Sequence, residues 1–223
     1  MFRSAAGLFG MLILGTPLSG YAHDASDAPL HPKPNIIYVL ADDLGYGDLG
    51  CYGQTKFETP HIDALAANGM KFLQHYSGST VCAPSRSSLL TGLHTGHTPI
   101  RGNKELQPEG QEPMPAKTIT IAELLKEAGY RTAAVGKWGL GFVETEGDPN
   151  NQGFDYFFGY NCQRYAHRYY PAYLWENNQK YPLEGNDWTD KVTYAPDVIH
   201  EKAMTYIREN KNQPFFLYYA AIM

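Results

Sequence analysis

The sequence has few cysteines, no cluster of basic residues and, after its first 22 residues, no long hydrophobic run. Without a later apolar stretch of about 20 residues, no stable membrane anchor is predicted. Eighteen Lys and Arg stand against 23 Asp and Glu, and the net charge is −5. This balance argues against a nucleic-acid partner. The 223 residues, of which 43% are hydrophobic, suffice for one substantial core.

The N-terminus has the pattern of a signal peptide. Arg3 provides a positive charge, "AAGLFGMLILG" is an apolar segment too short to span a bilayer, and "GYA" places small residues before a cleavage site. We therefore predict a signal peptide over residues 1–22, cleaved after Ala22, and a periplasmic or secreted protein. Residues 23–34 follow as a Pro-rich lead-in.

Three cysteines are present, Cys51, Cys82 and Cys162. An odd number in an oxidising compartment is typical of one disulfide and one remaining thiol. A disulfide between Cys51 and Cys162 is one arrangement, and unpaired structural thiols are the other. The sequence leaves both open.

Apolar runs and amphipathic segments alternate along the chain. Short apolar runs bounded by turn residues are typical of strands, and segments with Pro at the start and Gly after the end are typical of helices. The alternation predicts an α/β fold with a mostly parallel central sheet and helices on both faces. Strands are predicted over residues 35–40, 70–76, 131–135 and 214–223, and helices over 60–68, 120–128 and 194–210.

Three further expectations concern how these segments pack. The strand over residues 35–40 is continuously apolar, which predicts burial on both faces. Residues 145–195 have little periodicity, so they are predicted to form long loops over one end of the sheet. Met223 directly follows an apolar strand. Because an unpartnered apolar strand is an aggregation hazard, we expect the domain to be incomplete at its C-terminus.

Adjacent carboxylates follow the first predicted strand. Asp42 and Asp43 lie just past its carboxyl end, where ligand sites of open α/β sheets occur. Their oxygens suit a hard cation such as Ca²⁺ or Mg²⁺. A solvated Asp-Asp turn is the alternative. Asp48 is predicted to bond backbone amides of the turn.

A cysteine and an arginine lie at the predicted start of a helix. In "VCAPSRSSLLTG", Pro84 suits the first turn, so Cys82 sits where free N–H groups favour negative charge. Arg86 follows one helical turn later. This setting favours a reactive cysteine over a merely buried one. A thiol nucleophile would also need a His base, and nothing in the sequence places one beside Cys82.

A lysine follows another predicted strand at the same edge of the sheet. Lys137, in "TAAVGKWGLG", could join an arginine and a metal pair to bind a tetrahedral oxyanion. By itself, Lys137 would be read as a solvated loop residue.

Together these stretches resemble the type I sulfatases of the alkaline phosphatase superfamily, and bacterial arylsulfatases most of all. "CAPSR" with "SSLLTG" matches the Cys-x-Pro-Ser-Arg signature, "GYRTAAVGKWGLG" looks like the second signature, and "ADDLGYGDLGCYG" looks like the N-terminal metal-binding segment. The resemblance implies an alkaline phosphatase-like fold, with residues 35–223 as the N-terminal part of a sulfatase catalytic domain.

The resemblance implies hydrolysis of a sulfated small molecule or carbohydrate. A formylglycine-generating maturation enzyme would oxidise Cys82 to an aldehyde, whose hydrate attacks sulfur through one hydroxyl and releases sulfate when the second loses its proton. Arg86 would hold the hydrated aldehyde, and Lys137 would bind the sulfate. Asp42, Asp43 and the modified Cys82 would bind a divalent cation, calcium in most relatives and magnesium as the other candidate.

The sequence departs from the family pattern in two ways. Gly139 stands where many relatives have a His that acts on the leaving alcohol or positions the diol, so the identity of the acid is open. His167 is the candidate substrate-binding replacement, and a surface histidine is the plainer interpretation. The family's later metal ligands, a later His and a second Lys would lie beyond Met223. A cation held by three groups would be under-coordinated.

Three other functions are alternatives to sulfate ester hydrolysis. A phosphate or phosphonate ester hydrolase could use the same fold and a similar metal site. A truncated, non-catalytic remnant or a secreted binding module would keep an unmodified Cys82 and bind no calcium. A plain cysteine hydrolase is disfavoured because no His or Asn stands in a recognisable relation to Cys82.

Overall fold

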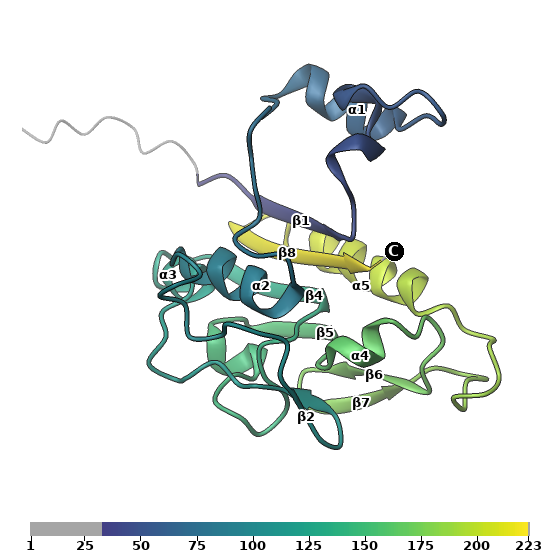
Figure 1. Cartoon of the computed structure of the whole chain (residues 1–223). Helices are drawn as coiled ribbons and strands as arrows, with labels where there is room; N and C mark the ends of the chain where they lie inside the picture. Colours follow the sequence, from purple (N-terminus) through teal and green to yellow (C-terminus); the bar gives the residue numbers. More distant parts are fainter. Residues whose placement is uncertain (1–32, 223) are drawn as a thin grey trace, which may run out of the picture. The chain divides into compact units, whose positions relative to one another are not determined.

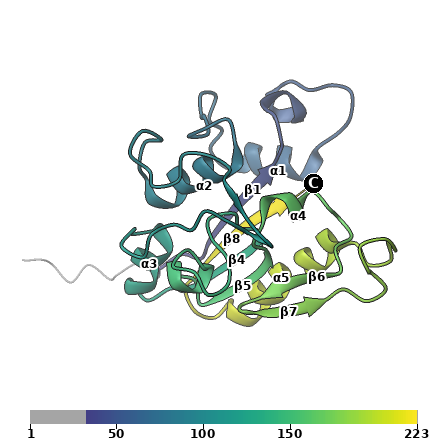
Figure 2. The ribbon, with the colours of Figure 1, turned by 60° about the horizontal axis from the view of Figure 1, so that its bottom comes forward.

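The structure is a computed structural model and describes residues 33–222. It contains a six-stranded sheet in the order β1-β8-β4-β5-β6-β7, in which β8 lies between β1 and β4 (Figures 1 and 2). The first four strands are parallel, and the last two pairings are antiparallel. The strands are β1 (Ile36–Asp42), β4 (Arg131–Lys137), β5 (Tyr156–Tyr160), β6 (Tyr173–Glu176), β7 (Gln179–Pro182) and β8 (Phe215–Ile222). A separate antiparallel pair joins β2 (Glu105–Leu106) to β3 (Gly110–Gln111).

Helices cover both faces of the sheet (Figure 1). On one face, Leu90 of α2 and Ala122 of α3 belong to the same buried cluster as Tyr218. On the other, Ile199 of α5 packs in a second cluster with Leu217. The helices are α1 (Pro60–Asn68), α2 (Cys82–Thr91), α3 (Ile121–Glu127), α4 (Gln163–Ala166) and α5 (Ala195–Asn210), with short 3₁₀ turns η1 (Tyr46–Asp48), η2 (Gly50–Tyr52) and η3 (Pro149–Gln152). The predicted α/β fold, a mostly parallel central sheet with helices on both faces, is confirmed.

The strand register places the ends of β1 and β4 at the same edge of the sheet. Asp42, the last residue of β1, pairs with Ile222 of β8. Gly136 of β4 pairs with Ala220, two positions earlier on β8. Since parallel strands end at a common edge, the residues that close β1 and β4 come close together.

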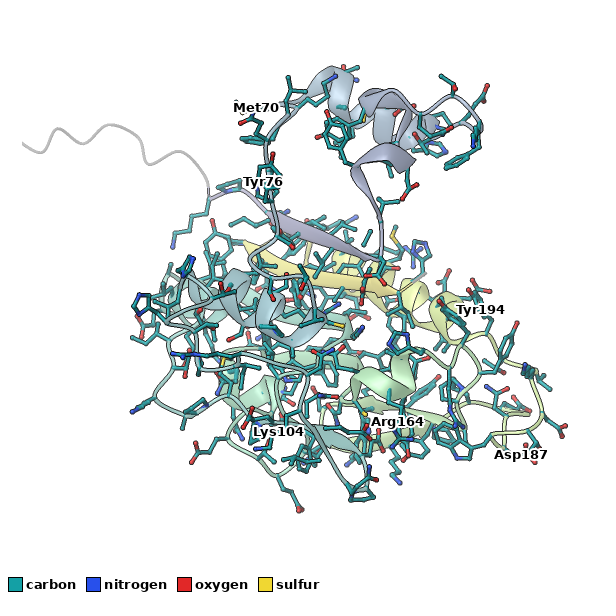
Figure 3. The ribbon with its side chains drawn as sticks, viewed as in Figure 1. Met70, Tyr76, Lys104, Arg164, Asp187 and Tyr194 are labelled. Atoms are coloured by element: carbon teal, nitrogen blue, oxygen red, sulfur yellow. The ribbon has the colours of Figure 1, made fainter. Side chains whose placement is uncertain are left out.

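The strand predicted over residues 70–76 is wrong. No strand is assigned there, and Met70 and Tyr76 are exposed on the segment that leads from α1 to α2 (Figure 3). An alternating pattern predicts a strand only where a neighbouring strand can pair with it and one face can be buried. Residues 70–76 have no neighbouring strand among the described residues, and their side chains are exposed.

The prediction of long loops over residues 145–195 is wrong in part. This segment contributes β5, β6 and β7 to the sheet, together with α4. Its strands are short, four or five residues each, and Gly and Pro surround them. Short strands with few alternating positions give a weak periodic signal, although their aromatic residues have high strand propensity.

The predicted strand over residues 35–40 exists, but it is not buried on both faces. Within the described residues, β1 pairs with β8 alone, and Ile37 and Val39 are 47% and 60% exposed. These two side chains lie on the face that α5 covers farther along the sheet. Because β1 lies at the edge of the sheet in the described residues, its apolar composition does not lead to burial on both faces.

Two predictions about the N-terminus stay untested. The signal peptide over residues 1–22 and nearly all of the lead-in over residues 23–34 lie outside the described residues. The domain boundary at residue 35 likewise stays a prediction. In residues 33–222, no helix has both the length and the apolar character that crossing a membrane requires.

Candidate functional site

Four predicted site residues meet at the carboxyl edge of the sheet. The Lys137 ammonium lies 2.7 Å from the Asp42 carboxylate and 3.3 Å from the Cys82 sulfur. The Arg86 guanidinium lies 3.0 Å from the same Asp42 oxygen. Lys137 and Arg86 are each only 2% exposed. Lys137 is therefore not a solvated loop residue. The alternative of a solvated Asp42-Asp43 turn fails for Asp42, whose side chain is 14% exposed, whereas Asp43 is exposed.

The fold fixes Arg86 by three separate contacts. One terminal nitrogen, Nη1, donates to the Lys137 carbonyl oxygen at 2.5 Å and to the Tyr218 hydroxyl at 3.3 Å. The other, Nη2, donates to Asp42. Among the described residues, the buried Nε has no hydrogen-bond partner. Nη1 thus donates only to protein groups, and Nε, on the opposite edge of the guanidinium, remains an unpaired donor.

The two carboxylates have opposite electrostatic settings. Partial burial works to raise the pKa of Asp42, but Lys137 and Arg86 outweigh it and hold the pKa below its ordinary value. The hydrogen bond and negative charge of Asp42 raise the pKa of the largely exposed Asp43, although the charges of Lys137 and His167 act in the lowering direction. Asp42 is thus neutralised by protein cations, whereas the charge of Asp43 faces the solvent side.

Cys82 is the first residue of α2, as the sequence predicted. The N-cap residue, Val81, has no side chain that could bond the free amides of the first turn. The Asn103 side chain does so instead, and its Oδ1 atom accepts from the Ala83 backbone amide at 2.9 Å. The Nδ2 atom of Asn103 lies 3.5 Å from the Cys82 sulfur. Cys82 is a free thiol, as are Cys51 and Cys162, so the Cys51–Cys162 disulfide is not formed.

Cys82, Arg86 and the two adjacent carboxylates line a cavity of about 560 Å³. Its wall combines the end of β1, the start of α2 and the turn that follows Asp43. The residues that line it include Asp42, Asp43, Asp48, Cys82 and Arg86. Asp48 also bonds the Gly45 amide at 2.7 Å, which confirms its predicted role in the turn. A cavity with a cysteine, an arginine and three carboxylates suits a small polar anion together with a cation.

The structure gives a physical reason for Gly139. Its φ is +80°, a left-handed conformation that favours glycine, and a Cβ atom there would collide with the side-chain amide of Gln163. A histidine at this position would have to displace Gln163, which is buried.

His167 caps the C-terminal end of α4 and is exposed. Its charge is close enough to lower the pKa of Asp43. The predicted substrate-binding histidine therefore belongs to the surroundings of the cavity, although it bonds none of the other site residues.

The donors at the cavity fit part of a hard-cation site. Asp42 and Asp43 present carboxylate oxygens, the preferred donors for Ca²⁺ and Mg²⁺. The raised pKa of Asp43 marks a repulsion that a cation would relieve. No group of three or more His, Cys, Asp or Glu placed to hold a metal ion occurs in residues 33–222. Calcium takes about 6–8 oxygens, so the carboxylates supply a minority of the ligands.

Sequence reasoning missed two residues of this site, Asn103 and Tyr218. Asn103 lies in a loop 21 residues after Cys82, and Tyr218 lies on the last strand. Neither is spaced from the motif residues in a way that predicts contact. Apolar composition marked Tyr218 as a strand residue, but not its hydroxyl as a partner of Arg86.

A match to a known protein family extends over almost the whole described region. The sequence profile of the family described as Sulfatase matches residues 34–222. An N-acetylgalactosamine-6-O-sulfatase from Bacteroides thetaiotaomicron is 48% identical over 56% of this chain and 26% of its own length. Human arylsulfatase A is 42% identical over 66% of this chain and 29% of its own length. The chain therefore spans less than a third of either curated relative.

Solved structures share the fold. A structure from work on glycosaminoglycan metabolism by Bacteroides thetaiotaomicron superposes with a TM-score of 0.72 at 31% identity, over 86% of this chain and 51% of the other. A second, in complex with its substrate D-glucosamine-2-N,6-O-disulfate, gives a TM-score of 0.66 at 30% identity, over 84% and 34%.

Proposed function

This chain belongs to the sulfatase family, and from that premise we propose that the protein hydrolyses sulfate esters at the cavity around Cys82. One observation carries the proposal. Lys137 reaches both the Cys82 sulfur and the Asp42 carboxylate, and Arg86 shares that carboxylate. A nucleophile position beside one buried cation, with a second cation on the same carboxylate, suits the anionic oxygens of a sulfate ester and the charge that develops on them during transfer.

We propose that Cys82 is converted to formylglycine by a maturation enzyme, which is thus a partner of this protein. When hydrated, this group supplies the oxygen that attacks sulfur. The chain's own residues do the rest. Lys137 stands beside residue 82 and can bind a sulfate oxygen as charge develops on it. Asp42 offsets the charge of Lys137 and Arg86 before substrate arrives and keeps both cations oriented.

Asp42, Asp43 and residue 82 are the groups that would hold a divalent cation, with calcium favoured and magnesium the other candidate. Such a cation would supply Lewis-acid activation and offset negative charge on the sulfate. The remaining ligands would come from water, the substrate or further protein groups. Support comes from the hard oxygen donors and from the unrelieved repulsion at Asp43.

His167 is proposed as the substrate-binding residue that interacts with the leaving alcohol. Its exposed side chain and its electrostatic effect on Asp43 support this assignment. The buried Gln163 fills the space beside Gly139, so the protonating group must come from another element.

The substrate class is proposed to be a sulfated carbohydrate or a small aryl sulfate. The relatives named above include a carbohydrate sulfatase and an arylsulfatase, and one solved neighbour holds a sulfated glucosamine. The proposed location is the periplasm or the exterior, which rests on the sequence of residues 1–22.

The test compares an aryl sulfate with the matching aryl phosphate, using protein purified from its own host. We expect release of the phenol from the sulfate ester to be much faster and to stop when calcium is chelated. Cys82→Ala should abolish it. Faster hydrolysis of the phosphate ester would favour the phosphatase alternative. No turnover of either ester, with an intact Cys82 thiol, would support a non-catalytic remnant.

A further inference from the structure

The Asn103 side chain contacts the reactive position 82 and the residue that follows it. Its carbonyl oxygen bonds the Ala83 amide at 2.9 Å, and its amide nitrogen lies 3.5 Å from the Cys82 sulfur. One planar amide therefore ties the backbone that carries the reactive residue to the side chain of that residue. Lys137 supplies the other donor to the sulfur, at 3.3 Å.

The loop that carries Asn103 is held in place by its own contacts. The carbonyl oxygen of the next residue, Lys104 (labelled in Figure 3), accepts from the Glu112 amide at 2.8 Å and from the Gln111 side chain at 3.1 Å. The Gln111 side chain in turn accepts from the Gln163 amide at 3.0 Å. Asn103 is thus linked through β3 to α4. A contact backed by such a shell is more precise than one made by a free loop.

We propose that Asn103 is a positioning residue for the reactive group at position 82. Its side-chain carbonyl oxygen sets the start of α2, and its side-chain N–H group holds the side chain at position 82, which Lys137 also contacts. The inference depends on the proposed function for its catalytic meaning. The contact itself exists in the unmodified thiol protein and can be tested there without turnover.

Asn103→Asp separates the two contacts. An aspartate keeps an oxygen for the Ala83 amide, and a carboxylate at a helix N-terminus is favourable. It loses the N–H donor toward the sulfur. Asn103→Ala loses both contacts. A helix cap alone would therefore be preserved in the first variant and lost in the second, whereas positioning of the sulfur would be lost in both.

The experiment uses the 223-residue chain made without the maturation enzyme, so that Cys82 remains a thiol. Thermal unfolding is measured, and alkylation by iodoacetamide at one fixed pH is followed by mass spectrometry. Cys51, which is partly exposed and held by other contacts, is the internal reference. We expect Asn103→Ala to lower the unfolding temperature by a few degrees and Asn103→Asp to leave it unchanged.

Asn103→Ala should slow alkylation of Cys82 by about three- to tenfold, the effect of losing one hydrogen bond to the attacking sulfur, with Cys51 unaffected. Asn103→Asp should slow it further, because its carboxylate also repels the thiolate. If Cys82 in the neutral variant Asn103→Ala reacts within twofold of the parent rate, or faster, Asn103 merely caps α2 and the proposal is overturned. Sulfatase activity does not enter the measurement, so a failure here is distinct from a failure of the proposed function.

Discussion

At the scale of single residues, the site depends on how Arg86 and Lys137 are kept charged and oriented inside the protein. Both are almost fully buried, and both use the same Asp42 oxygen. A buried cation without a partner is strongly unfavourable, so removal of Asp42 would disturb both. The Tyr218 hydroxyl and the Lys137 backbone carbonyl add two neutral contacts to Arg86.

We predict that Tyr218→Phe weakens binding of inorganic sulfate about tenfold, because a hydrogen bond to a charged group contributes about 1.5–3 kcal/mol and this one is long. The ring packing against Phe154 should survive, since only the hydroxyl is removed. Isothermal titration of sulfate into the matured protein measures the effect.

Tyr219→Phe is the matched control. Tyr219 is the next residue on β8, its side chain belongs with the cluster on the opposite face of the sheet, and it makes no contact with Arg86 among the described residues. An equal loss of affinity in both variants would show that Tyr218 acts through general packing of β8 and not through Arg86.

The sequence alone could predict the residues of the site whose positions follow from the strand edges and the start of a helix. Asp42 and Lys137 end parallel strands, and Cys82 begins α2, so topology brings them together. Asn103 and Tyr218 reach the site through tertiary contacts. Nothing in local pattern or spacing specifies such contacts, and the same holds for the Gln163 side chain that requires a glycine at position 139.

At the scale of secondary-structure elements, the helices were predicted more accurately than the strands. Helices α1, α3 and α5 carry terminal signals such as Pro60, Gly129 and Pro196 near their ends. The strands of the 145–195 segment are too short to give a clear alternation, and residues 70–76 alternate without a partner strand. Strand formation depends on a neighbour, which sequence pattern does not provide.

One ion pair joins α3 to the start of β4 and β5. Asp155 lies 2.7 Å from the Lys126 ammonium and accepts from the Thr132 amide at 3.1 Å. Partial burial works to raise the pKa of Asp155, but Lys126 and Thr132 outweigh it, so the pKa lies below its ordinary value. Stability from this carboxylate is therefore present above its unfolded pKa of about 4 and is lost as pH falls through the folded value.

We predict that Asp155→Asn lowers the free energy of unfolding by about 1 kcal/mol at pH 7, since the pair is half-exposed and one backbone hydrogen bond is also weakened. The difference from the parent should shrink below pH about 4, where the carboxylate of the unfolded parent takes up a proton, and disappear below the lowered pKa of the folded carboxylate. Urea unfolding at several pH values provides the measurement. Glu127→Gln, at the end of the same helix, is the control, and a difference independent of pH would contradict the assignment to charge.

At the scale of the whole molecule, the chain carries the sulfatase signatures on a sheet whose β1 edge is exposed within the described part. It spans 26% and 29% of the curated relatives named above. Cys82, Arg86 and three carboxylates line the cavity, and Lys137 contacts Cys82 and Asp42. The proposed roles of these groups are the nucleophile position, anion binding and part of a cation site. Complete coordination of a cation needs more donors than Asp42, Asp43 and residue 82 supply.

The proposed hydrolysis requires that residue 82 is a formylglycine and not a thiol. The most direct measurement is the mass of the peptide that contains it, isolated from the protein in its native host. We predict that Cys82 has lost its sulfur and two hydrogens and has gained one oxygen. An aldehyde-reactive probe should label this peptide. An unmodified thiol in protein from that host would contradict the proposed formylglycine-dependent hydrolysis of sulfate esters.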